Sequence, residues 1–162
     1  MKILLFIAFQ LLISTNALSW EIEKSIDPLN DEPFGQAHIT SKQPFVDGPV
    51  NPLFLNMAII CKPAGWNTGF YVDEPHIIDD VFQIHYRIGK SLAKKTSPSE
   101  SHQTVILAPE ILNDKETFSD LLTPGATIFV RAISSFQVIE GHFELDGISG
   151  AINDIGDHCE KR

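Results

Sequence analysis

The chain has 162 residues, of which 43% are hydrophobic and 20% are charged. This balance is typical of a folded globular protein and excludes a disordered chain. The 12 basic and 21 acidic residues give a net charge of −9 at pH 7. Because that charge repels polyanions, we expect no binding to nucleic acid.

The first 19 residues have the layout of a cleavable secretory signal. Lys2 gives a positive start, Ile3–Ile13 is an almost unbroken apolar run, and Ala17-Leu18-Ser19 ends it with small residues. We therefore expect residues 1–19 to be removed, leaving one secreted globular domain, 20–162, with a net charge near −10 after the loss of Lys2. The apolar run is shorter than the roughly 20 residues that a membrane-spanning helix needs, so no such helix is expected.

The rest of the chain predicts mostly strands. Residues 20–43 begin in turns rich in Asp, Pro and Asn, and residues 90–101 are expected to form an exposed, mobile loop. Apolar runs and alternating patterns between the turns predict strands at 35–40, 53–61, 66–72, 81–88, 104–108, 127–133 and 136–145. Within 81–88, the pattern places Phe82, Ile84, Tyr86 and Ile88 on one face and leaves Arg87 on the other.

Two short helices are predicted near the C-terminus. The first, 114–122, has Phe118, Leu121 and Leu122 on one side. The second, 147–159, carries an apolar stripe formed by Ile148, Ile152, Ile155 and Cys159. Half-apolar strands must cover one another, so the sequence predicts a mainly β, antiparallel, β-sandwich-like single domain.

Two cysteines, Cys61 and Cys159, are present. An even cysteine count in an exported domain indicates a disulfide, which here ties the final helix to a strand end. The alternative is a reactive or metal-binding pair of thiols, but the wide spacing and the lack of a Cys-x-x-Cys motif argue against it.

Catalytic and metal-binding motifs are scarce. No two of the six histidines have the local spacing of metal ligands, and no nucleophile motif or phosphate-binding glycine loop occurs. We therefore expect no cofactor and no catalytic or metal-binding residue. Two alternatives stay open: a calcium site in the acidic 73–80 segment, and a hydrolase that uses Asp79 or Asp80 with His76 or His85.

Most aromatic residues lie on predicted strands, where they are expected to fill the core. Trp66 follows Gly65 at a hairpin turn and is the best candidate for an exposed contact with a partner.

The order of several segments resembles the VasI-type family of periplasmic accessory proteins associated with type VI secretion. The matching residues are Trp20, Asp27-Pro28-Leu29, Met57-Ala-Ile-Ile-Cys61, Ile84-His-Tyr-Arg87-Ile-Gly89, Phe118-Ser-Asp-Leu-Leu122, Ile128-Phe-Val-Arg131, Phe143-Glu-Leu-Asp-Gly-Ile148, Ala151-Ile152 and Cys159. The segment 94–102 departs from the family pattern because it lacks a tryptophan. The resemblance implies a periplasmic, non-enzymatic, disulfide-bonded domain, and adds Arg87, in the strand with the arginine, as a second candidate contact.

These features predict an accessory or interaction domain that binds another periplasmic or envelope protein. The alternative is an acidic inhibitor of a basic cell-wall hydrolase such as lysozyme, since a strongly negative charge would steer that encounter.

Overall fold

The structure is a computed structural model that describes residues 19–44, 53–72, 80–102 and 105–160. Strands make up 46% of it and helices 19%, and the strands form two antiparallel sheets. The expected mainly β, sandwich-like fold is therefore confirmed. The expected leader, apart from Ser19, lies outside the described residues.

One sheet has six strands in the order β1-β2-β3-β4-β8-β7. Its strands are β1 (Glu21–Ile26), β2 (Pro33–Thr40), β3 (Asn56–Lys62), β4 (Gly65–Tyr71), β7 (Glu100–His102) and β8 (Val105–Leu107). Strand β2 alternates strictly between buried and half-buried residues, which is the period of two that a strand with one covered face requires.

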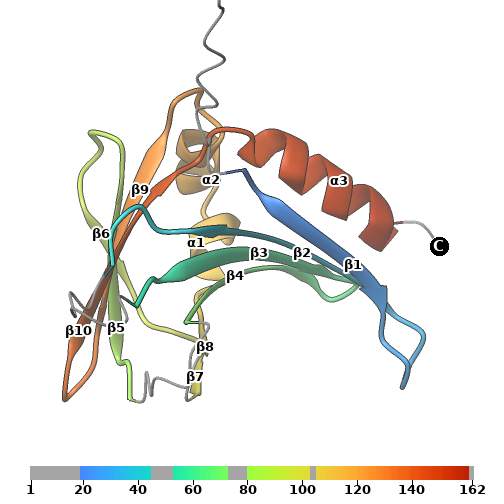
Figure 1. Ribbon diagram of the computed structural model, residues 1–162, viewed down its shortest axis with the longest axis horizontal. Coiled ribbons are helices and arrows are strands. Elements are labelled where there is room, and N and C mark those ends of the chain that lie inside the picture. The colour runs from blue at the N-terminus through green and yellow to red at the C-terminus, as the bar shows by residue number, and fades with distance from the viewer. Residues whose placement is uncertain (1–18, 45–52, 73–79, 103–104, 161–162) are drawn as a thin grey trace, which may run out of the picture.

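The other sheet has four strands in the order β10-β9-β5-β6. Its strands are β5 (Gln83–Ile88), β6 (Lys94–Thr96), β9 (Thr127–Ile133) and β10 (Val138–Glu144). Figure 1 shows this sheet standing across one end of the larger sheet, with the strands of the two sheets crossing at a large angle. Just after β2 the chain reaches the smaller sheet, where the Lys42 backbone N–H donates to the carbonyl oxygen of His142 at 2.8 Å.

The core lies where the inner faces of the two sheets meet. Phe70 of β4 and Phe143 of β10 are both fully buried, and their ring centroids are 6.3 Å apart. On β5, Ile84, Tyr86 and Ile88 are buried as the alternation predicts, whereas Phe82 precedes the strand and is exposed.

Two short helices, α1 (Glu110–Asn113) and α2 (Lys115–Leu121), follow β8. Asp114 caps α2 by accepting a hydrogen bond from the Glu116 backbone N–H, and it also accepts one from the Lys94 ammonium on β6 at 2.7 Å. The hydrogen bond with Lys94 is the main reason that the pKa of Asp114 falls to about 2, and the same pairing raises the pKa of Lys94. This contact fastens the edge strand of the smaller sheet to α2.

The long helix α3 (Ile148–Glu160) lies over one face of β1 and β2 (Figure 1). It approaches β2 so closely that a Cβ added at Gly35 would lie 2.9 Å from the Cβ of Ile155. A disulfide joins Cys159 of α3 to Cys61 of β3, as expected, and Lys24 of β1 pairs with Asp154 at 2.5 Å.

Three sequence expectations were wrong. The segment expected to begin in turns contains β1, whose six residues are all exposed, so the strand depends on backbone pairing with β2 rather than on burial. The expected loop at 90–101 contains β6 and most of β7, which pair with β5 and β8. A third helix, α1, adds to the two expected helices, and it buries Ile111 and Leu112.

No helix in the described part of the chain is long and apolar enough to cross a bilayer.

Candidate functional site

The outer face of the four-stranded sheet is the strongest candidate for a binding surface. Alternation turns one set of side chains on each strand into the core and the other set outward. The outward set consists of Gln83, His85, Arg87, Lys95, Thr127, Phe129, Arg131, Ile133, Val138, Glu140, His142 and Glu144.

Strand pairing arranges these side chains in rows across the sheet. His85 of β5 lies opposite Lys95 of β6 on one side and Arg131 of β9 on the other, and Arg131 in turn lies opposite Glu140 of β10. In an adjacent row, Arg87 lies opposite Phe129. Directly opposed residues on one face of a sheet are close enough to interact, so β5, β6 and β9 bring three cationic side chains around His85.

Arg131 is the one of these three cations that has a carboxylate partner in the described structure. Its Nε donates to Oε1 of Glu140 at 2.6 Å, and its guanidinium lies 5.9 Å from the centroid of the Phe129 ring. Arg87 and Lys95 are exposed, and neither forms an ion pair within the part of the chain that the structure describes. The sheet therefore presents two positive charges that no carboxylate of the described residues balances, on a chain of net charge −9.

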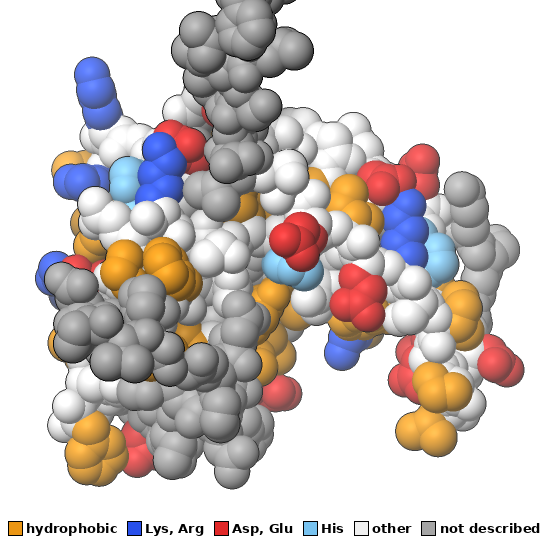
Figure 2. Space-filling view, viewed as in Figure 1, with side chains coloured by type: hydrophobic (Ala, Val, Ile, Leu, Met, Phe, Trp, Pro, Cys, Tyr) orange, Lys and Arg blue, Asp and Glu red, His pale blue; other side chains and the backbone are white. Residues whose placement is uncertain are grey.

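In Figure 2 most of the Lys and Arg side chains in view lie on the left, at the end of the molecule that the four-stranded sheet forms, although Asp and Glu side chains are present there as well as at the centre and right. A fixed positive region on an acidic protein directs an anionic group to one face and away from the rest of the surface.

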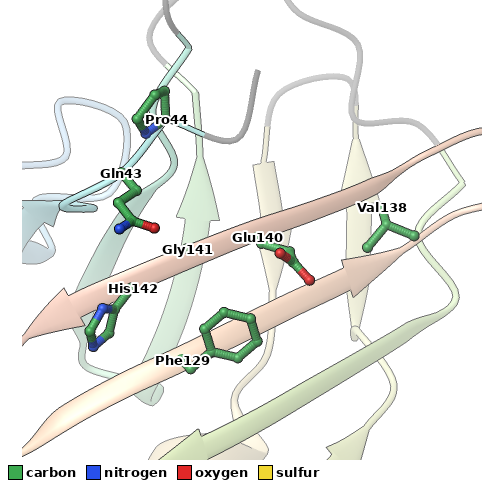
Figure 3. Close-up of a pocket in the computed structure, with 7 residues that line it drawn as sticks. All are labelled: Gln43, Pro44, Phe129, Val138, Glu140, Gly141 and His142. Atoms are coloured by element: carbon green, nitrogen blue, oxygen red, sulfur yellow. The ribbon is translucent and has the colours of Figure 1, made fainter. Parts of the chain in front are cut away.

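Two hollows adjoin on this face, and Phe129 lines both. The first has a volume of about 300 Å³ and is lined by His85, Tyr86, Arg87, Ala93, Phe129 and Arg131. The second, of about 330 Å³, is lined by Gln43, Pro44, Phe129, Val138, Glu140, Gly141 and His142. Figure 3 shows the Phe129 ring on the same side of the sheet as the Glu140, His142 and Val138 side chains of the neighbouring strand.

The chemistry of this face suits binding. Guanidinium groups recognise planar anions such as carboxylates with two parallel hydrogen bonds, and an aromatic ring adds apolar contact area. Among the described residues lining the two hollows there is no Ser, Thr or Cys that could act as a nucleophile. His85 Nε2 lies 2.7 Å from Oε1 of Gln83, so one ring nitrogen already has a partner.

The two expected contact residues lie on different surfaces. Arg87 belongs to the outer face of the four-stranded sheet. Trp66 lies in the six-stranded sheet opposite Cys61, is half-buried, and packs against α3, where a Cβ added at Gly156 would lie 3.3 Å from its ring. Trp66 therefore supports the helix beside the disulfide, and only its exposed part is open to a partner.

The other sequence alternatives lie mainly outside the described residues. Of the four residues weighed for hydrolysis, Asp80 and His85 are described, and Asp80 has a left-handed backbone with φ of 57°. His76, Asp79 and most of the expected calcium segment 73–80 are not described. Within the described ranges, no three His, Cys, Asp or Glu side chains cluster in a way that could hold a metal ion.

Sequence reasoning missed the contributions of Phe129, Arg131 and His142 to this face. Strand 127–133 was expected, and alternation alone puts Phe129 and Arg131 on its polar side. The missing information was the pairing of β5 with β9, which places Arg87 beside Phe129.

No family model, curated protein or solved structure matches this chain. The resemblance to VasI-type proteins therefore stays a prediction from the sequence, and the case for function rests on the geometry of the site.

Proposed function

We propose that this protein is a non-enzymatic interaction domain that acts outside the cytosol and binds another protein through the outer face of its four-stranded sheet. The observation that carries the proposal is the exposed guanidinium of Arg87, which has no ion-pair partner among the described residues and lies opposite Phe129 beside a hollow of about 300 Å³. Arginine and aromatic side chains are enriched where proteins bind one another, and a charged group with no internal partner is available to an outside one.

The sequence and the disulfide support a place outside the cytosol. A leader-like N-terminus precedes a domain whose two cysteines are bonded, and structural disulfides persist mainly in oxidising compartments. The periplasm, and an accessory role beside a type VI secretion apparatus, rest on the family resemblance alone.

A pull-down with matched variants tests the proposal. Tagged wild-type protein, Arg87→Glu and Lys115→Glu are each incubated with envelope extract, and the recovered proteins are identified by mass spectrometry. Lys115 is an exposed residue of α2, so its substitution changes the charge by the same amount away from the sheet face. We expect one partner to be recovered by the wild type and by Lys115→Glu, and lost with Arg87→Glu.

The proposal fails if the wild type recovers no partner at any salt concentration, or if all three proteins recover the same set. Circular dichroism and thermal unfolding of the variants show whether a lost partner reflects a lost surface rather than a lost fold.

A second candidate function, inhibition of a basic hydrolase, is favoured by the turn between β1 and β2. This turn extends away from the body of the molecule (Figure 1) and carries Asp27 and Glu32, with Leu29 at 94% exposure. A projecting acidic loop suits insertion into a basic cleft. Lysozyme turnover that stays unchanged in the presence of excess protein would remove this candidate.

A further inference from the structure

We infer that the outer face of the four-stranded sheet recognises an extended acidic segment of its partner, with several carboxylates crossing the strands. The inference rests on the proposed function and deepens it by assigning the chemistry of the partner. It is carried by three observations: the positions of the cations, the balance of charge around them, and two apolar residues beside them.

The cations are spread over three neighbouring strands. Arg131 of β9 and Lys95 of β6 stand in one row on either side of His85 of β5, and Arg87 lies two residues from His85 on β5. Adjacent strands are about 4.8 Å apart, so the row extends about 10 Å across the sheet. A single terminal carboxylate contacts one or two of these groups, whereas an extended peptide places same-side carboxylates about 7 Å apart and engages both ends of the row.

The charge balance favours an anionic segment. The carboxylate of Glu140 holds one edge of the Arg131 guanidinium, which has five N–H donors and so keeps others for a ligand. Arg87 and Lys95 add two positive charges that no described carboxylate balances. The carboxylates of an acidic segment would supply the partners for Arg87 and Lys95 without bringing further positive charge onto the face.

The next row of the same face has two apolar residues side by side. Val138, which is 53% exposed, lies opposite the half-buried Ile133, and Ile133 in turn lies opposite Gln83. If the acidic segment carries an apolar side chain at one end, that side chain covers Val138 and Ile133 while the carboxylates contact the cations. This pattern separates a protein segment from inorganic or nucleic-acid phosphate, which offers no aliphatic group to bury.

The limited size of the positive region also separates a short segment from a long polyanion. A nucleic acid or an anionic membrane extends beyond the sheet face and meets the negative field of a chain with 21 acidic residues. A segment of a few residues stays on the face.

Fluorescence anisotropy with defined peptides tests the inference. The probe is a labelled octapeptide with glutamates at alternate positions and one valine near its end. The comparison peptides replace every glutamate with glutamine, or keep only a free C-terminal carboxylate, and a labelled 12-nucleotide single-stranded DNA serves as the polyanion.

We expect the glutamate peptide to bind in low salt and the glutamine peptide to bind at least about tenfold more weakly, because charged contacts at an open face contribute on this scale. Arg87→Glu and Lys95→Glu should each weaken the glutamate peptide by about tenfold, while Lys115→Glu should leave it unchanged. A Val138→Ser variant should weaken the peptide by about threefold, since it removes apolar contact only.

Equal binding of the glutamate and glutamine peptides overturns the inference, and so does glutamate binding that both charge reversals leave intact. If the DNA binds more strongly than the glutamate peptide, the face is a general anion site, and the inference is overturned. If only the peptide with a free C-terminal carboxylate binds, the face is a terminus-binding site, and the inference is overturned as well. If the peptides fail but Arg87→Glu still loses the partner in the pull-down, the proposed function stands and only this inference falls.

Discussion

Removing the disulfide should reveal how strongly the final helix depends on it. We consider the double variant Cys61→Ser, Cys159→Ser. Cys61 is buried on β3 with 2% of its surface exposed, and Cys159 lies one residue before the end of α3. The Sγ of Cys61 lies 3.6 Å from the carbonyl oxygen of Ile155, so a serine hydroxyl there has a nearby acceptor, and Cys159 is only half-buried, so a serine hydroxyl there can bond to water.

The expected cost follows from the loop that the disulfide closes. The bonded cysteines are 98 residues apart. For a loop of that length, chain-entropy reasoning gives about 16 cal/mol/K of lost unfolded-state entropy, or about 4.7 kcal/mol at room temperature. Measured losses for native disulfides are commonly about 2–5 kcal/mol, so we expect the free energy of unfolding to fall within that range. Because a typical domain has about 5–15 kcal/mol in total, the variant should be folded only marginally.

Equilibrium urea unfolding, followed by tryptophan fluorescence, measures this difference. Trp66 lies opposite Cys61 and packs against α3, so its emission reports on the region that the disulfide holds. Wild-type protein with its disulfide reduced should unfold like the double variant, which controls for the serine side chains.

A loss of less than about 1 kcal/mol would refute the reasoning, because the unfolded chain would then gain little freedom from the broken link. Two free thiols in the folded wild-type protein would refute its premise.

Two further predictions concern packing and pH. Lowering the pH from 5 to 1.5 should remove the stabilisation that Asp114 contributes, because its ion pair with Lys94 exists only while the carboxylate is charged. The loss should occur between the ordinary pKa of the Asp114 carboxyl, 3.8, and its pKa in the folded protein, about 2. The melting temperature of Asp114→Asn should therefore start lower near pH 5 and fall less over that interval, and parallel curves for the two proteins would contradict the prediction. Gly35→Ala should lower the free energy of unfolding by about 1–3 kcal/mol, because its Cβ would lie 2.9 Å from the Cβ of Ile155 and α3 would have to move. Gly150→Ala, at a position of α3 where an added Cβ meets no other atom, should instead raise the free energy of unfolding by up to about 1 kcal/mol in the same urea assay. Equal effects at Gly35 and Gly150 would contradict the packing argument.

Local pattern predicted the elements whose own side chains make the core. In β5, alternation correctly buried Ile84, Tyr86 and Ile88, and in α3 the apolar stripe correctly placed Ile148 and Ile155 against the sheet. These predictions succeed because a strand or helix with one covered face must repeat its apolar residues with its own period.

Local pattern failed where a strand forms by backbone pairing without a periodic row of buried side chains. Strand β1 buries none of its residues, and β6 has only three, so neither carries enough periodic burial to be recognised. Each forms because an adjacent strand, β2 or β5, offers a row of unpaired backbone groups.

The sequence by itself determined a mainly β domain and supplied the only two cysteines, and therefore the only pair that a disulfide could join. The tertiary structure alone decided which outward-facing side chains of different strands become neighbours. Arg87 and Phe129 are 42 positions apart in the chain, and only the register of β5 against β9 makes them neighbours on an open surface. Side-chain period is a local property of a segment, whereas strand register depends on how the entire core packs, so the surface that we propose for binding emerges only in the folded chain.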